Sequence, residues 1–120
     1  MKGPGCPFCS NDESELVLRT ELWFAMWDKH PVSRGHLLII PFRHVQSYFE
    51  TTREEKLGLL EMIDKSKELL DARFKPDGYN IGMNLGEAAG QSVMHFHLHV
   101  IPRYKGDSSN PRGGIRGVIR

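Results

Sequence analysis

The chain has 120 residues, which is enough for one domain around a single hydrophobic core. Apolar residues (39%) and charged residues (26%) occur in the proportions of an ordinary soluble globular protein. Sixteen basic and fifteen acidic residues leave a formal net charge of +1, so the composition indicates neither a nucleic acid nor a membrane as partner. No apolar run approaches the ~20 residues of a membrane helix, and no apolar segment follows the basic residue near the N-terminus. We therefore expect a cytoplasmic protein without a secretory signal.

The first third of the chain is expected to hold a turn-rich segment and then short strands. Residues 1–14 are rich in glycine, proline and small polar residues. The β-forming residues of segment 16–26 predict two short strands with a break between them. Residues 30–35 have the composition of a loop. The apolar run 36–40, stopped by a proline, predicts a strand that is buried on both faces.

One long helix is the clearest predicted element. Thr52 and Glu55 have the spacing of a capping box, and Pro76 with the two residues after it predicts the helix end. Charges of both signs are interspersed along the other positions, which is typical of a solvated face. The apolar residues that recur at helical intervals are Leu59, Met62, Ile63, Leu69, Leu70 and Phe74.

Two further strands are predicted after the helix. They cover residues 79–85 and 95–101, with a small-residue loop over 86–90 between them and Pro102 closing the second. The order of these elements, a few strands, one long helix and then two strands, predicts an α+β domain with a mainly antiparallel sheet. Residues 103–120 are basic and rich in glycine, and we expect a mobile cationic tail there.

The chemistry is expected from the alternating histidines His95, His97 and His99. In a strand they share one face, while the apolar residues between them face the core. Each buried imidazole needs a hydrogen-bond partner or a ligand, so three on one face favour a functional site over simple packing. Two interpretations remain open from the residues alone. Either the face binds a catalytic metal ion, or one imidazole attacks phosphorus while its neighbours orient it.

Two neighbouring features favour phosphorus chemistry. Residues 88–104 contain no acidic residue that could complete a metal site. Residues 90–93, directly before the histidines, supply hydrogen-bond donors of the kind that stabilise charge developing on a phosphate.

Two segments carry a resemblance to a known family. Gly90-Gln91-Ser92-Val93 followed by His95-Phe96-His97-Leu98-His99-Val100-Ile101 resembles the signature of the histidine-triad (HIT) nucleotide hydrolases and transferases. Residues 35–44, Gly-His-Leu-Leu-Ile-Ile-Pro-Phe-Arg-His, resemble a second block of that family. The long helix separates the two blocks, so the resemblance covers most of the chain. It implies a single HIT-like domain over residues 1–120 that forms a homodimer through the helix and a neighbouring strand.

The resemblance also implies catalytic roles. His97 is the expected nucleophile, which attacks the α-phosphorus of a nucleotide and forms a nucleotidyl-histidine that water then hydrolyses. His99 is expected to contact the α-phosphate and help activate His97, and His36 to lie by the phosphate and orient the site. Gln91 and Ser92 match positions that hydrogen-bond the phosphate or the leaving group.

A nucleotide-binding pocket follows from the same resemblance. Asp28 matches the residue that binds the ribose, and a carboxylate can accept hydrogen bonds from both ribose hydroxyls. Asn84 matches a polar residue near the sugar and the phosphate. Met26 and Leu38 match apolar walls of the base pocket, although core packing explains them equally well, and Phe8 is a further candidate wall.

Cys6 and Cys9 form a Cys-x-x-Cys pair, which zinc sites and redox pairs share. In a reducing compartment a metal site or free thiols are favoured over a structural disulfide. Some HIT relatives, including the galactose-1-phosphate uridylyltransferases, bind zinc through two N-terminal cysteines. The resemblance then implies Cys6, Cys9, His44 and His95 as ligands of a structural zinc ion that involves segment 1–14, because four protein ligands close the site. Free cysteines, with His95 as an orienting base, are the alternative. No organic cofactor is expected.

The tail favours one class of substrate. Residues 110–119 resemble the end of microbial members near the diadenosine polyphosphate hydrolases, which favours a dinucleoside polyphosphate. Three alternatives stay open: a nucleoside phosphoramidase, a metal-dependent phosphohydrolase that uses the triad as ligands, and a nucleotide-binding module with little turnover.

Overall fold

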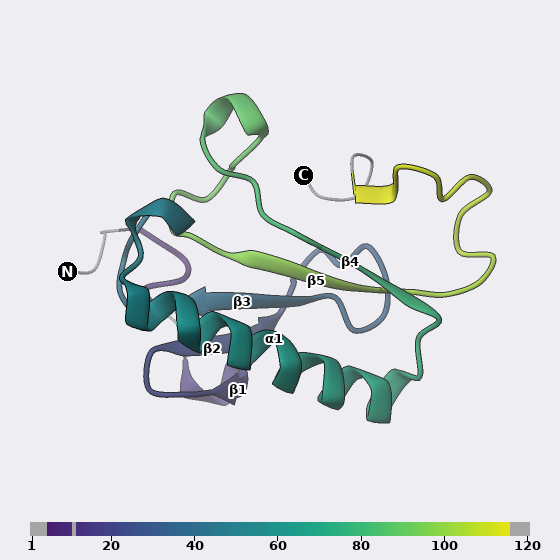
Figure 1. Ribbon diagram of the computed structural model, residues 1–120, viewed down its shortest axis with the longest axis horizontal. Coiled ribbons are helices and arrows are strands. Elements are labelled where there is room, and N and C mark those ends of the chain that lie inside the picture. Colours follow the sequence, from purple (N-terminus) through teal and green to yellow (C-terminus); the bar gives the residue numbers. More distant parts are fainter. Residues whose placement is uncertain (1–4, 11, 116–120) are drawn as a thin grey trace.

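The computed structural model describes residues 5–10 and 12–115, so the last five residues of the expected cationic tail lie outside the described part. Within it, five antiparallel strands form one sheet in the order β1-β2-β3-β5-β4, and one long helix, α1, contacts β2, β3 and β5 (Figure 1). The predicted α+β class is confirmed. The elements are β1 (Leu16–Arg19), β2 (Trp23–Trp27), β3 (Leu37–Pro41), α1 (Arg53–Phe74), β4 (Gly78–Gly82) and β5 (Leu98–Arg103), with single-turn helices η1 (Glu13–Glu15), η2 (Tyr48–Glu50) and η3 (Glu87–Ala89).

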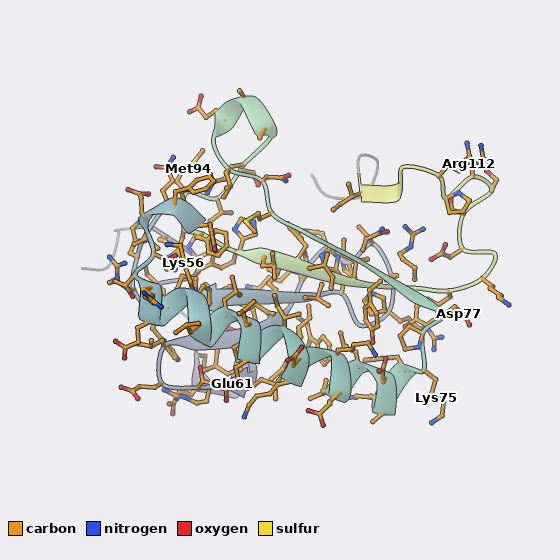
Figure 2. All side chains as sticks on the ribbon, viewed as in Figure 1. Lys56, Glu61, Lys75, Asp77, Met94 and Arg112 are labelled. Atoms are coloured by element: carbon orange, nitrogen blue, oxygen red, sulfur yellow. The ribbon has the colours of Figure 1, made fainter. Side chains whose placement is uncertain are left out.

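The capping box predicted the start of α1 correctly. The Glu55 amide donates to Thr52 Oγ1 over 3.0 Å, and the Thr52 amide donates to Glu55 Oε1 over 2.7 Å. At the other end, Lys75 adopts a left-handed conformation with φ 50° and ends the helix before Pro76. The charged face is solvated as predicted, since Glu61 (labelled in Figure 2) and Lys65 are both exposed. Glu61 Oε1 and Lys65 Nζ lie 3.5 Å apart.

The Thr52 cap supports a first prediction. Replacing Thr52 by alanine removes the acceptor for the Glu55 amide, so the free energy of unfolding should fall by about 1 kcal/mol. Urea denaturation of the two proteins measures the difference. A Thr52→Ser variant keeps a hydroxyl acceptor and should retain most of that stability; equal losses in the two variants would contradict the capping role.

Strand alternation divides the core between the two faces of the sheet. Phe96, Leu98 and Val100 pack with residues of α1 such as Met62 in the larger cluster. Phe24, Met26, Leu38 and Ile40 form a smaller cluster on the other face. Strand β3 is buried along its whole length and supplies both clusters, as the apolar run predicted.

The bounds of the last strands differ from the prediction. β5 begins at Leu98 and not at His95, because its pairing with β3 starts at Leu98 opposite Ile39. The chain before Leu98 turns instead toward the loop after β3, where the Phe96 amide donates to the Val45 carbonyl over 2.6 Å. β4 ends at Gly82, three residues earlier than predicted.

Pro102 lies inside β5 and does not close it. Its partner on β4 is Tyr79, whereas pairing with β3 ends at Val100. The Pro102 carbonyl accepts a hydrogen bond from the Ser33 hydroxyl, so the backbone at this position faces the 30–35 loop. A proline costs no ladder hydrogen bond there. The strand continues to Arg103, and the irregular tail therefore begins at Tyr104.

No helix in the described part of the chain combines the length and the apolar character needed to cross a bilayer.

Candidate active site

A pocket of about 670 Å³ opens where β2, β3 and the triad segment meet the N-terminal segment. Most predicted catalytic and nucleotide-binding residues line it: Met26, Asp28, His36, Leu38, Ser92, His97 and His99, together with Phe8. Val93, from the predicted donor segment 90–93, also lines it. The remaining lining residues were not predicted, namely Pro7, Trp27, Lys29, His30 and Val32. His97 and His99 of the triad therefore face a cavity large enough for a small-molecule ligand.

His97 is held as a neutral imidazole with one free lone pair. Its Nδ1 lies 2.9 Å from the carbonyl oxygen of His95. Because a carbonyl only accepts, Nδ1 carries the proton and Nε2 keeps its lone pair. Burial lowers the pKa of His97, against the opposing effect of this hydrogen bond. His97 therefore offers an uncharged nucleophilic nitrogen at neutral pH.

The Val32 backbone amide determines which ring nitrogen is protonated in His36 and, through His36, in His99. The Val32 amide donates to His36 Nδ1 over 3.1 Å, so a neutral His36 carries its proton on Nε2. That nitrogen lies 2.9 Å from His99 Nδ1. When His99 Nδ1 accepts this hydrogen bond, the proton of His99 is on Nε2. His99 Nε2 is buried and has no hydrogen-bond partner among the described residues, so this side chain, which lines the pocket, keeps an unused donor.

Segment 88–104 has no acidic residue, but Asp28 supplies a carboxylate beside the triad from the end of β2. Its Oδ2 lies 3.3 Å from His36 Nε2 and 4.0 Å from His99 Nδ1, and its Oδ1 accepts the His30 amide over 2.8 Å. Asp28, His36 and His99 together offer three converging metal-ligand atoms. A histidine ligand, however, binds metal through a lone pair and donates its other N–H. His36 has the opposite arrangement, which favours a hydrogen-bonded relay over a metal site here.

The four predicted zinc ligands do come together, and their geometry fits zinc. Each offers one ligand atom, and these four atoms lie within 4.8 Å of one another. His95 Nδ1 is 3.4 Å from both Cys6 Sγ and Cys9 Sγ and 3.1 Å from His44 Nδ1, while Cys9 Sγ is 3.0 Å from His44 Nδ1. Ligand atoms around tetrahedral zinc lie roughly 3.3–3.8 Å apart. The two distances from His95 to the cysteines fall in this range, and the two to His44 are slightly shorter.

The protonation of His95 also suits a ligand. Its Nε2 lies 2.8 Å from the Pro41 carbonyl and therefore carries the proton, which leaves the Nδ1 lone pair for the cluster. One nitrogen cannot satisfy three neighbours by hydrogen bonding, whereas a shared metal ion can. The cluster is compatible with Zn²⁺ on its donor set and its geometry.

Comparison with known proteins identifies the family of this chain. The family model of the HIT domain matches residues 10–106. The chain belongs to the HIT family. It is 35% identical over 104 residues to AP-4-A phosphorylase of Mycobacterium tuberculosis, covering 86% of this chain and 53% of that protein. It is 37% identical over 98 residues to the bis(5'-adenosyl)-triphosphatase of Dictyostelium discoideum, covering 82% and 66%. The chain thus spans about half the length of the phosphorylase.

Solved structures of HIT proteins share the fold. A HIT family protein from Bacillus anthracis superposes with a TM-score of 0.81 at 36% identity, covering 88% of this chain and 78% of that one. A Zn-bound histidine triad family protein from Mycobacterium smegmatis superposes with a TM-score of 0.72 at 33% identity, covering 79% and 69%.

Two predicted site residues of this HIT domain lie outside the pocket lining. Gln91 is buried; its side-chain oxygen accepts the Gly86 amide over 2.8 Å, and its Nε2 donates to the Gln46 and Val93 carbonyls. The amide thus holds the loop on which Ser92 reaches the pocket. Asn84 is half-buried beyond β4. Contact of either side chain with a nucleotide stays a prediction.

The buried His99 predicts a dependence of stability on pH. Burial, with repulsion from His97 and His36, lowers the pKa of His99 from 6.5 to about 4. Between these two pH values the unfolded chain binds more protons than the folded one. The free energy of unfolding should therefore decrease as the pH is lowered, by up to about 1.4 kcal/mol per pH unit. Urea denaturation at pH 6.5 and pH 5 measures this slope. A His99→Asn variant should show a shallower one, and an unchanged slope would contradict the assignment.

Proposed function

We propose that this HIT domain cleaves dinucleoside polyphosphates of the diadenosine polyphosphate type by transferring a nucleotidyl group to His97. The observation that carries the proposal is the hydrogen bond from His97 Nδ1 to the His95 carbonyl, which leaves the Nε2 lone pair for attack. The names of two relatives, a phosphorylase of AP-4-A and a bis(5'-adenosyl)-triphosphatase, support this class of substrate.

In the proposed first step, His97 Nε2 forms a bond to the α-phosphorus. The bond from that phosphorus to the bridging oxygen breaks, and the leaving nucleotide takes the electron pair. His99 Nε2–H donates to an α-phosphate oxygen, where negative charge increases in the transition state. The Nδ1–H of His97 stays on the His95 carbonyl and stabilises the ring when it becomes cationic.

In the second step an acceptor attacks the same phosphorus. With water, a new P–O bond forms, a proton passes to solvent, and the electron pair of the broken N–P bond returns to His97 Nε2. Phosphate as acceptor would give a nucleoside diphosphate by the same route.

The pocket walls suggest how the nucleotide lies. Met26, Leu38 and Phe8 offer an apolar surface for the base. Asp28 lines the same pocket with its Oδ2 4.0 Å from His99 Nδ1, so its carboxylate would accept from the ribose hydroxyls near the triad. Ser92 also lines the pocket and would contact the phosphate. A nucleotide placed in this way has its α-phosphorus beside His97.

We also infer that Cys6, Cys9, His44 and His95 hold a structural zinc ion. The ion would supply no open coordination position, so it takes no part in the reaction. Its ligands tie the N-terminal segment to the sheet and thereby place Pro7 and Phe8 in the pocket wall.

A homodimer through α1 and the edge strand β4 belongs to the same proposal. Leu57 and Leu60 on α1 are 60% and 61% exposed, and Ile81 on β4 is 39% exposed. Burial of such side chains against a second copy would favour association. We expect sedimentation to give twice the mass of one chain, and a Leu57→Asp, Leu60→Asp double variant to sediment as one chain; a wild-type monomer at micromolar concentration would contradict the dimer.

The reaction is tested by trapping the intermediate. The protein is mixed with diadenosine tetraphosphate, quenched within milliseconds, and its intact mass is measured. We expect an added adenylyl group that acid removes. A substrate with a chiral α-thiophosphate should react with retention at phosphorus, because two displacements occur. Inversion would contradict a covalent intermediate.

The alternatives are separated by product analysis. Chromatography with and without inorganic phosphate distinguishes a hydrolase from a phosphorylase. Faster turnover of adenosine 5'-phosphoramidate than of diadenosine tetraphosphate would indicate a phosphoramidase. Tight binding of AMP without turnover of either would indicate a nucleotide-binding module.

A further inference from the structure

The single N–H of His36 has two acceptors within reach. Because Nδ1 accepts the Val32 amide, the only proton of the neutral ring is on Nε2. That nitrogen is 2.9 Å from His99 Nδ1 and 3.3 Å from Asp28 Oδ2. His36 and His99 are 3% and 5% exposed, so water has little access to complete either hydrogen bond. In the structure this N–H is hydrogen-bonded to His99 Nδ1, and Asp28 Oδ2 is a second acceptor close enough to take it after a small rotation of the His36 ring.

The choice between the two acceptors determines which nitrogen of His99 carries its proton. With the His36 N–H on His99 Nδ1, His99 holds its own proton on Nε2, an unpartnered buried donor in a side chain that lines the pocket. With the His36 N–H on Asp28, His99 Nδ1 loses that donor. The ring proton of His99 can then move from Nε2 to Nδ1, which turns toward Asp28 Oδ2, 4.0 Å away in the structure, as its acceptor. His99 Nε2 would then be a lone pair, which repels a phosphate oxygen.

We propose that ribose binding decides between the two acceptors, so that recognition of the sugar sets His99 for phosphate chemistry. The inference rests on the proposed function, with Asp28 as the ribose ligand. When the two ribose hydroxyls donate to the Asp28 carboxylate, that carboxylate becomes a weaker acceptor for His36. The His36 N–H then passes to the nearer His99 Nδ1, and His99 Nε2–H faces the α-phosphate. Asp28 is thus a binding residue that also positions His99 through His36.

Kinetics give the first test. Single-turnover rates at saturating concentration are measured with diadenosine tetraphosphate and with its analogue that lacks the 2' and 3' hydroxyls. For the natural sequence we expect the analogue to react on the order of 10-fold to 100-fold more slowly. In an Asp28→Asn variant the ratio of the two rates, natural substrate over analogue, should fall close to one. Asparagine keeps an oxygen for the His30 amide but removes the charged acceptor beside His36.

Two results would overturn the proposal at this stage. One is an analogue that raises KM but leaves the saturating rate unchanged, because ribose contacts then serve binding only. The other is an Asp28→Asn variant in which loss of the ribose hydroxyls slows the reaction as much as it does in the natural sequence. The matched control is Asp64→Asn, the same change at an exposed position of α1, which should leave the ratio as in the natural sequence.

Spectroscopy gives a second test that needs no turnover. The ¹⁵N resonances of the imidazoles report which nitrogen of His99 is protonated, in the free protein and with AMP or 2',3'-dideoxy-AMP added. We expect AMP to raise the population with the proton on Nε2 and the dideoxy compound to raise it much less. Equal shifts with the two nucleotides, or no binding of AMP, would overturn the inference. A clear difference in a protein without turnover would support it and contradict only the proposed reaction.

Discussion

Replacing His97 by alanine is expected to lower kcat for diadenosine tetraphosphate by at least about 10³-fold and to abolish the trapped adenylyl group. The variant loses the only imidazole in the pocket whose free lone pair is fixed by a carbonyl on its other nitrogen. His99 cannot replace it in the relay described above, because the His36 N–H occupies its Nδ1 and its Nε2 carries the proton. Rapid-quench kinetics and intact mass measure the two effects.

The control for this prediction is His30→Ala. His30 also lines the pocket, but its imidazole has no assigned part in the reaction, so kcat should change far less. Thermal unfolding of both variants shows whether each is folded at the assay temperature. An adenylyl group that persists on the His97→Ala protein would assign the nucleophile to another residue.

Loss of the zinc site is expected to have the largest effect on stability. Cys9 is 9% exposed, and its Sγ is close to His44 and His95. A Cys9→Ser variant should bind no zinc and lose about 3 kcal/mol or more, equivalent to a fall in Tm on the order of 10 °C. Metal analysis and calorimetry of both proteins, with and without a chelator, measure this. We expect one zinc ion per chain in the natural sequence.

The neighbouring Ser10→Ala change is the matched control, because it alters the same segment but no ligand. Its Tm and zinc content should remain those of the natural sequence. A natural protein that carries no zinc after expression with added zinc, and whose Tm a chelator does not change, would contradict the metal site.

Local patterns predicted local structure well. The Thr52 and Glu55 pair predicted the first turn of α1, because a capping box satisfies backbone amides within one turn. The alternation of histidine and apolar residues predicted the two faces of the triad segment. It did so although only His99 of the three lies in a regular strand, because the extended chain keeps its alternation where pairing stops.

The missed features depend on contacts between distant segments. The start of β5 is set by its register against β3, which no residue within segment 95–101 encodes. Asp28 reaches the triad because β2, β3 and β5 are neighbours in the sheet. The protonation of His36 is set by the Val32 amide, and a backbone donor leaves no mark in residue types. Only the resemblance to HIT proteins placed Asp28 near the site in advance.

The contact between His95 and His97 affects how the domain can change by mutation. The group of His95 that holds the proposed nucleophile is its carbonyl, which every amino acid possesses, whereas its imidazole belongs to the Cys/His cluster. A substitution at this position would therefore remove a proposed zinc ligand and still leave the acceptor for His97 Nδ1. On the proposed function, metal binding and catalysis can thus be lost one at a time, although the two sites are adjacent along the chain.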